Sequence, residues 1–196
     1  MDEKPSRLSR TFCVSLKQLV ALLLLGIVVV AGVFWAAQRL NTHKRWASML
    51  RESQRLRGHL DRVALLLPTK FQTNPDPTSK NWFIAELHYA DSSLLELIKL
   101  DGEHQVPLGK IEHMITTLSD PDVDLSGLNS TEQEDLMEAI HNIGWKVVKA
   151  YGNLLDYTSV NSVNGPPFWY SGPAPPDEGI LEEAAQLATN VTTKIG

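Results

Sequence analysis

The stretch that decides the fold runs from residue 18 to residue 38 and reads QLVALLLLGIVVVAGVFWAAQ. It carries no charged side chain, and its core, residues 19–37, is 19 residues long. At ~1.5 Å per residue such a helix is about 28 Å long, which matches the hydrocarbon thickness of a bilayer. Trp35 lies near the far end, where aromatic rings favour the membrane interface. The segment therefore predicts a transmembrane helix.

Two other interpretations of this segment fit less well. A buried core helix rarely stays apolar on every face over this length. A cleaved signal peptide has a shorter apolar region followed by a small-x-small site, whereas the best such site here, Val30-Ala31-Gly32, lies inside the apolar run. We therefore expect an uncleaved, single-pass signal-anchor at residues 18–38. It comes after a basic tail at residues 1–17 and precedes one helical domain at residues 39–196, with the lipid bilayer as a partner.

The charges divide sharply along the chain. Residues 1–58 hold ten Lys and Arg against three acidic residues, and residues 59–196 hold eight against twenty. The basic part flanks the apolar segment, where anionic headgroups would hold it. The acidic part argues against nucleic acid as a partner, because binding to phosphates needs clustered Lys and Arg.

The orientation in the membrane is less directly encoded. Lys and Arg are more numerous after the apolar segment than before it, which taken alone favours a cytoplasmic domain. Against this stands the common arrangement in which a short N-terminal tail stays inside while the anchor exports the domain after it. The glycosylation sequons at Asn129 and Asn190 also fit an exported domain. We expect the domain to lie outside a cell membrane, against the charge count.

Beyond the membrane segment the apolar residues recur with a helical period. One stripe steps by threes and fours until Pro68 and consists of Trp46, Met49, Ser53, Leu56, Leu60, Val63 and Leu67. It is too short to separate a coiled-coil stalk from one face of a bundle, and we favour the bundle face. This helix could continue straight out of the membrane.

Four further helices are expected. The second ends near Lys99 and Gly102, and Pro107 opens the third. Ser130 or Thr131 caps the fourth, with Gln133 or Glu134 closing a capping box. Its apolar face is expected at Leu136, Ile140, Ile143, Val147, Tyr151 and Leu154, with Gly144 and Gly152 inside the helix.

The last helix begins near Asp177, after a loop at residues 161–176 that holds five of the eleven prolines. Its apolar residues are Ile180, Ala184, Leu187, Val191 and Ile195. Amphipathic helices joined by short loops bury their stripes against each other. The sequence therefore predicts an all-α protein, in which the transmembrane helix precedes an antiparallel bundle of about four to five helices.

One acidic turn, residues 120–127, could bind a metal. Counted from Asp122, it places Asp122, Asp124 and Ser126 at positions one, three and five of a calcium loop, with Gly127 at position six. In this respect it resembles an EF-hand loop over about a dozen residues. Position twelve is Gln133 instead of the bidentate Glu. The alternative is a solvated turn before the next helix. Apart from this Ca²⁺ candidate we expect no cofactor.

Three consecutive aromatic residues, Phe168, Trp169 and Tyr170, lie in the proline-rich loop. Aromatic side chains are costly to leave in water, so we expect them to cover one end of the bundle. The alternative is a contact patch for a partner or for the membrane interface.

Local motifs for catalysis are absent from the sequence. It has no Gly-rich phosphate loop, no Gly-x-Ser-x-Gly elbow and no His-Glu-x-x-His helix, and its one cysteine is Cys13. We therefore favour a non-enzymatic interaction or scaffold module at the membrane that docks another protein. The alternatives are a ligand-sensing bundle that works with a separate output subunit, and an enzyme whose site is assembled across helices. Gly32 and Ala36 form a small-x-x-x-small pair that gives weak support to a homo-oligomer.

Overall fold

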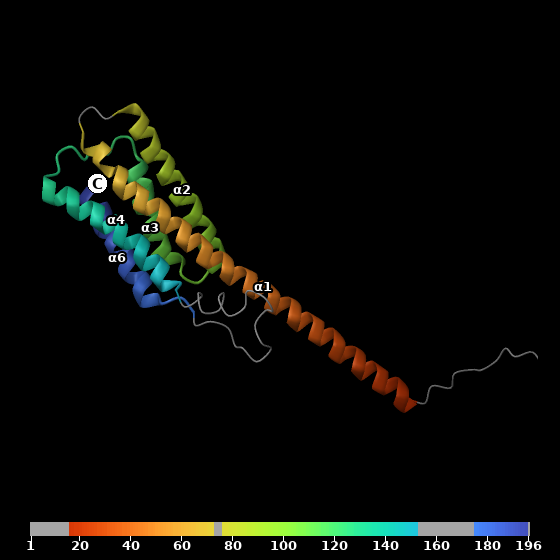
Figure 1. Cartoon of the computed structure of the whole chain (residues 1–196). Helices are drawn as coiled ribbons and strands as arrows, with labels where there is room; N and C mark the ends of the chain where they lie inside the picture. Colours follow the sequence, from red (N-terminus) through yellow and green to blue (C-terminus); the bar gives the residue numbers. More distant parts are fainter. Residues whose placement is uncertain (1–15, 73–75, 153–174, 196) are drawn as a thin grey trace, which may run out of the picture. The chain divides into compact units, whose positions relative to one another are not determined.

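The computed structural model describes residues 16–72, 76–152 and 175–195 (Figure 1). All regular elements in these ranges are helices, five of them α-helices and one a 3-10 helix. The predicted all-α fold is confirmed. The chain divides into two compact units, Met1–His43 and Lys44–Gly196.

The first unit contains the apolar part of helix α1, which spans Leu16–Leu66. Its most apolar window has a mean hydropathy of 2.8, and none of that window is buried. A core helix of a soluble protein would instead be largely covered by its neighbours. By length and composition α1 could cross a membrane, and the described residues hold one such helix.

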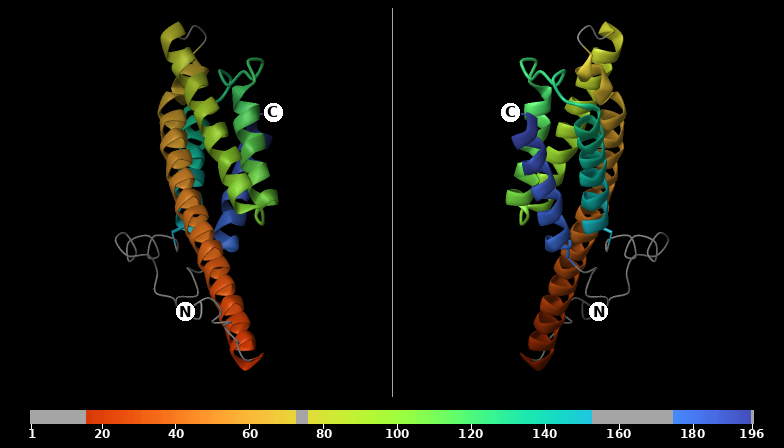
Figure 2. Two further views of the ribbon diagram at one scale, coloured as in Figure 1. Left: turned by 90° about the vertical axis from the view of Figure 1, so that its right-hand side faces the viewer. Right: turned by 90° about the vertical axis from the view of Figure 1, so that its left-hand side faces the viewer.

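The second unit is a helical bundle built from the rest of α1 and the elements after it. These are η1 (Leu67–Phe71), α2 (Pro77–Asp101), α3 (Gln105–Ser119), α4 (Ser130–Ala150) and α6 (Glu178–Ile195). Helix α2 packs on α3, and α6 packs on both α3 and α4 (Figures 1 and 2). The short connection at residues 102–104 makes α2 and α3 antiparallel.

The core is formed by the apolar stripes of all five helices. The predicted stripe on α1 is confirmed, because Met49, Leu56 and Leu60 are buried and Trp46 is partly buried against them. Pro68 lies in η1, directly after the end of α1. The remaining helices contribute further buried side chains, among them Phe83, Leu87, Leu94, Leu108, Ile111, Met114, Ile140, Ile143, Leu181 and Val191.

The C-terminal end of α2 agrees with the prediction, and the helix begins at Pro77. Asp76 caps its first turn by accepting a hydrogen bond from Ser79 N, and Gly102 closes its last turn with a left-handed backbone at φ 71°. Glycine suits this position because it has no Cβ to clash in the left-handed region.

The N-cap of α4 differs from the prediction. Asn129, one residue earlier than expected, accepts from the backbone N–H of Glu132, whose side chain accepts from Asn129 N in return. The prediction placed the cap at Ser130 or Thr131. Asn is as good a cap as Ser, and its pairing with Glu132 satisfies two backbone donors together.

The C-terminal end of α4 also comes earlier than predicted. The helix ends at Ala150, so Gly152 lies outside it, and Leu154 falls outside the described residues. Gly144 is where the fold requires a glycine, because a Cβ there would lie 3.2 Å from Arg57 Cα. The predicted face of α6 is partly shifted: Leu181 and Ala188 are fully buried, while Ile180 and Leu187 lie at the edge of the core.

Candidate functional site

Within the bundle, a surface strip between α1 and α2 combines exposed aromatic side chains with an ion-pair cluster. The centre of the strip is Glu86 of α2, whose Oε2 lies 2.7 Å from His59 Nδ1 and 2.8 Å from Arg62 Nε. The ring of His59 lies 5.4 Å from the ring of Tyr89. We call this strip the α1–α2 seam, and it consists of His59, Arg62, Trp82, Glu86 and Tyr89.

Glu86 is held in its charged form. Burial by itself would raise the pKa of Glu86, but hydrogen bonds from His59 and Arg62 outweigh burial and place the pKa below its ordinary value. Glu86 is only 7% exposed, so its carboxylate needs these partners. The polar centre of the seam is therefore satisfied from within the bundle.

Large apolar side chains lie on both sides of this centre. His59 pairs with Tyr89, and Arg62 pairs with Glu86, so α1 and α2 run antiparallel. Trp82 lies on the next turn of α2 beyond this centre, on the same face as Glu86 and Tyr89. Trp82 is 59% exposed and Tyr89 57%. An exposed apolar patch of this kind, interrupted by an ion pair, is typical of a protein-binding surface.

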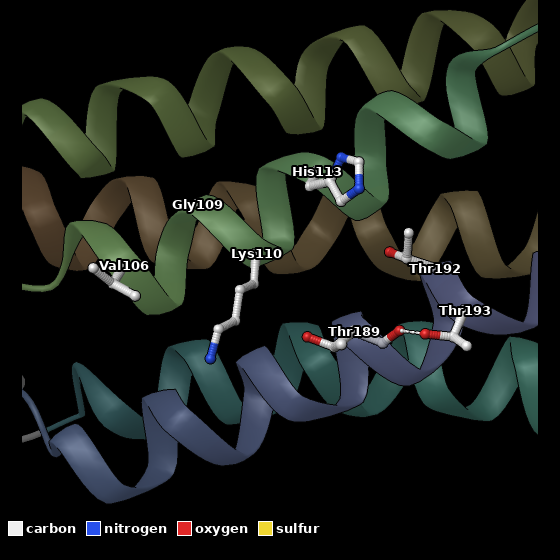
Figure 3. Close-up of a pocket in the computed structure, with 7 residues that line it drawn as sticks. All are labelled: Val106, Gly109, Lys110, His113, Thr189, Thr192 and Thr193. Carbon is white, nitrogen blue, oxygen red and sulfur yellow. Dashed lines mark hydrogen bonds between the residues drawn. The ribbon is translucent and has the colours of Figure 1, made fainter. Parts of the chain in front are cut away.

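A second feature is a groove of about 370 Å³ between α3 and α6 (Figure 3). On α3 it is lined by Val106, Gly109, Lys110 and His113. On α6 it is lined by Thr189, Thr192 and Thr193. Lys110 Nζ lies 3.4 Å from Glu182 Oε2, and both side chains are about half exposed, so this ion pair is weak.

The two walls of the groove offer opposite hydrogen-bonding groups. Each of the three threonine hydroxyls donates to the carbonyl four residues earlier in α6, at 2.9 Å, and so presents only lone pairs to the groove. The α3 wall instead carries the ammonium of Lys110, which has three donors and no acceptor. His113 lies one turn further along α3, on the same wall (Figure 3).

A third cluster is buried at the corner between α2 and α3. Asp101 is 2% exposed and accepts from the hydroxyl of Tyr151, which is fully buried at the C-cap of α4. His104 Nδ1 lies 2.9 Å from the same carboxylate. Arg45 of α1 donates to the carbonyls of Leu100 and Asp101, which the end of the helix leaves without intrahelical partners.

Tyr151 acts in this cluster as a hydrogen-bond donor. Burial raises the pKa of its hydroxyl, and the hydrogen bond to the Asp101 carboxylate raises it further. The hydroxyl therefore keeps its proton throughout the physiological range. The cluster links α1, α2, the start of α3 and the end of α4, and its role is structural because Asp101 and Tyr151 are both closed to solvent.

The residues of the predicted calcium loop lie in a turn in which aspartate side-chain oxygens accept hydrogen bonds from the turn's own backbone. Asp124 Oδ1 accepts from Ser126 N at 2.9 Å, and this bond is the main reason why the pKa of Asp124 lies below its ordinary value. Asp120 Oδ1 accepts from Asp122 N in the same manner. Across residues 16–72, 76–152 and 175–195, no three His, Cys, Asp or Glu side chains are grouped to hold a metal ion. Calcium binding by Asp122, Asp124 and Ser126 stays a prediction from the sequence pattern.

The aromatic prediction at Phe168, Trp169 and Tyr170 lies outside the described residues. The seam was missed at the sequence level although its signal was present. Trp82, Glu86 and Tyr89 are spaced by four and three residues, off the apolar stripe of α2. The groove and the Asp101 cluster have no local signal, because their residues come from distant parts of the chain.

Comparison with protein-family models, with characterised proteins and with solved structures finds no match to this chain.

Proposed function

We propose that the chain is a membrane-anchored interaction module whose α1–α2 seam docks a protein partner. The observation that carries the proposal is the exposure of Trp82 and Tyr89 around the satisfied Glu86 cluster. Large apolar side chains gain about 1.5–3 kcal/mol each when they are fully buried, so a partner that covers them is favoured. Trp, Tyr and Arg are also the residues that most often dominate binding energy at interfaces.

The charges near the seam indicate what kind of partner surface would bind there. In the part of α1 that belongs to the bundle, Arg51 and Arg55 are exposed on the same helix as Arg62, and Lys80 is exposed near the start of α2. Basic residues around an apolar strip favour a partner surface with apolar side chains and surrounding acidic residues. The seam would supply the apolar contacts, and the basic residues would speed association.

The test is co-purification of the full chain in mild detergent. Trp82→Ala combined with Tyr89→Ala should remove a stoichiometric partner, because interface residues of this kind each contribute about 2 kcal/mol, or roughly thirtyfold in Kd. The matched control is Val106→Ala, which trims an exposed apolar side chain away from the seam. Equal recovery of the partner with both variants, or no stoichiometric partner for the native chain, would refute docking at the seam.

We also propose that residues 18–38 anchor the chain in a cell membrane with the bundle outside. The length and apolar composition of α1 support the anchor. Cys13 is the single thiol, so labelling with a membrane-impermeant maleimide needs no engineered site. Labelling only after permeabilisation is the expected result. Labelling in intact cells would place the bundle in the cytoplasm, as the Lys and Arg count favours.

Ligand sensing with a separate output subunit is a second candidate function, and the α3–α6 groove favours it. A sensor needs a ligand site between helices, whereas an interaction module needs only a packed core and an exposed patch. Stabilisation of the full chain by small molecules in a thermal-shift screen would support sensing. If no compound stabilises the chain, docking of a protein at the seam remains the supported function.

A further inference from the structure

The α3–α6 groove contains a glycine that neither packing nor backbone geometry explains. Gly109 lies inside α3, where glycine costs about 0.5–1 kcal/mol relative to alanine. A Cβ at Gly109 would meet no heavy atom within 4 Å, whereas at Gly144 it would press on the backbone of Arg57. Gly58 is equally uncrowded, so open space alone does not mark a site. At Gly109 the open space coincides with the groove.

We propose that this groove binds a free α-amino acid with an apolar side chain. The ammonium of Lys110 suits the ligand's carboxylate. The lone pairs of Thr189, Thr192 and Thr193 on the opposite wall suit the ligand's ammonium group, since their own protons are used within α6. Glu182 adds negative charge on the α6 side.

The size and the apolar lining of the groove agree with this ligand class. A volume of about 370 Å³ lies in the range of small-molecule binding sites, about 300–1,000 Å³. Val106 is 72% exposed and, with the methyl groups of the threonines, offers an apolar contact for the ligand's side chain. The ion pair between Lys110 and Glu182 is long and solvent-exposed, so a ligand carboxylate can compete for Lys110 at little cost.

The test compares three probes by titration calorimetry on the full chain in detergent. The probes are L-leucine, 4-methylpentanoate, which lacks the amine, and 3-methylbutylamine, which lacks the carboxylate. We expect leucine to bind up to about fivefold more tightly than either truncated probe, because pairs between half-exposed charged groups contribute about 0.2–1 kcal/mol each. Lys110→Gln should reduce leucine binding and leave the weak binding of the amine unchanged.

A Cβ meets no heavy atom within 4 Å at Gly109 or at Gly58, so Gly109→Leu places a bulky side chain at the groove and Gly58→Leu places the same side chain elsewhere. Leucine binding should be lost in the first variant and kept in the second, and circular dichroism should show both folded. The proposal is overturned if leucine does not bind, if the three probes bind equally, or if Gly109→Leu binds leucine as the native chain does. It does not depend on the seam, because the seam variants leave the groove intact.

Discussion

The buried hydrogen bond between Tyr151 and Asp101 gives the sharpest prediction for stability. Tyr151→Phe removes the hydroxyl and keeps the ring, so the core loses a donor without gaining a large cavity. Hydrogen bonds to charged groups contribute about 1.5–3 kcal/mol, and Asp101 is nearly closed to water that could replace the donor. We expect the free energy of unfolding to fall by about that amount. For a bundle of about 150 residues, this corresponds to a decrease in Tm of roughly 3–12 °C.

The assay is chemical and thermal unfolding of the full chain in detergent, monitored by circular dichroism. Tyr89→Phe is the matched control, since Tyr89 is 57% exposed and its hydroxyl is accessible to water. A double-mutant cycle with Asp101→Asn should show coupling between the two positions. A loss below about 0.5 kcal/mol for Tyr151→Phe, or equal losses for both tyrosine variants, would refute the structural role of this bond.

The same bond predicts a pH dependence. The folded-state pKa of Tyr151 is raised above its unfolded value of about 10. Its stabilising contribution is therefore fully present below about pH 10 and is lost as pH rises towards the folded-state pKa. An alkaline absorbance titration should show one tyrosine that ionises only when the bundle unfolds, and Tyr151→Phe should leave the earlier part of the curve unchanged.

Three other features of the chain give predictions of their own. Gly144→Ala should destabilise the bundle by about 1 kcal/mol, because the new Cβ would press on Arg57 Cα. Gly58→Ala should stabilise it by about 0.5–1 kcal/mol, because a Cβ there has open space and alanine favours the helix, and urea unfolding measures both changes. The pKa of Glu86 is lowered, so its contribution to stability is present above the ordinary pKa of 4.5 and is lost as pH falls through the folded-state pKa. Glu86→Gln should therefore reduce the loss of stability between about pH 6 and pH 3. An equal loss in both proteins would contradict this. Alkaline carbonate should leave the full chain with membranes and release a chain that lacks residues 18–38, whereas release of both would exclude the anchor.

The sequence predicted the fold because the fold depends on local periodicity. The stripe from Met49 to Leu67 and the cap at Gly102 lie where the spacing of apolar residues and the left-handed preference of glycine place them. The start of α4 was wrong by one residue, since Asn129 and Ser130 are both good caps and only the reciprocal bonds with Glu132 distinguish them.

The candidate sites were harder to predict because they combine distant residues. Asp101 and Tyr151 are fifty residues apart in the sequence, and neither belongs to a motif. The groove depends on the lateral packing of α3 against α6, which periodicity does not fix. The aromatic spacing of Trp82 and Tyr89 on α2 was visible, but their exposure became clear only from the register between α1 and α2.

Photocrosslinking from position 82 tests docking at the seam most directly. The full chain, including its apolar N-terminal helix, carries p-benzoylphenylalanine in place of Trp82 and is irradiated in cells, with the same residue at exposed Thr116 of α3 as the control. The account predicts one discrete adduct from position 82, weakened by Tyr89→Ala and not formed from position 116. No adduct from position 82, or the same adducts from both positions, would contradict docking at the seam.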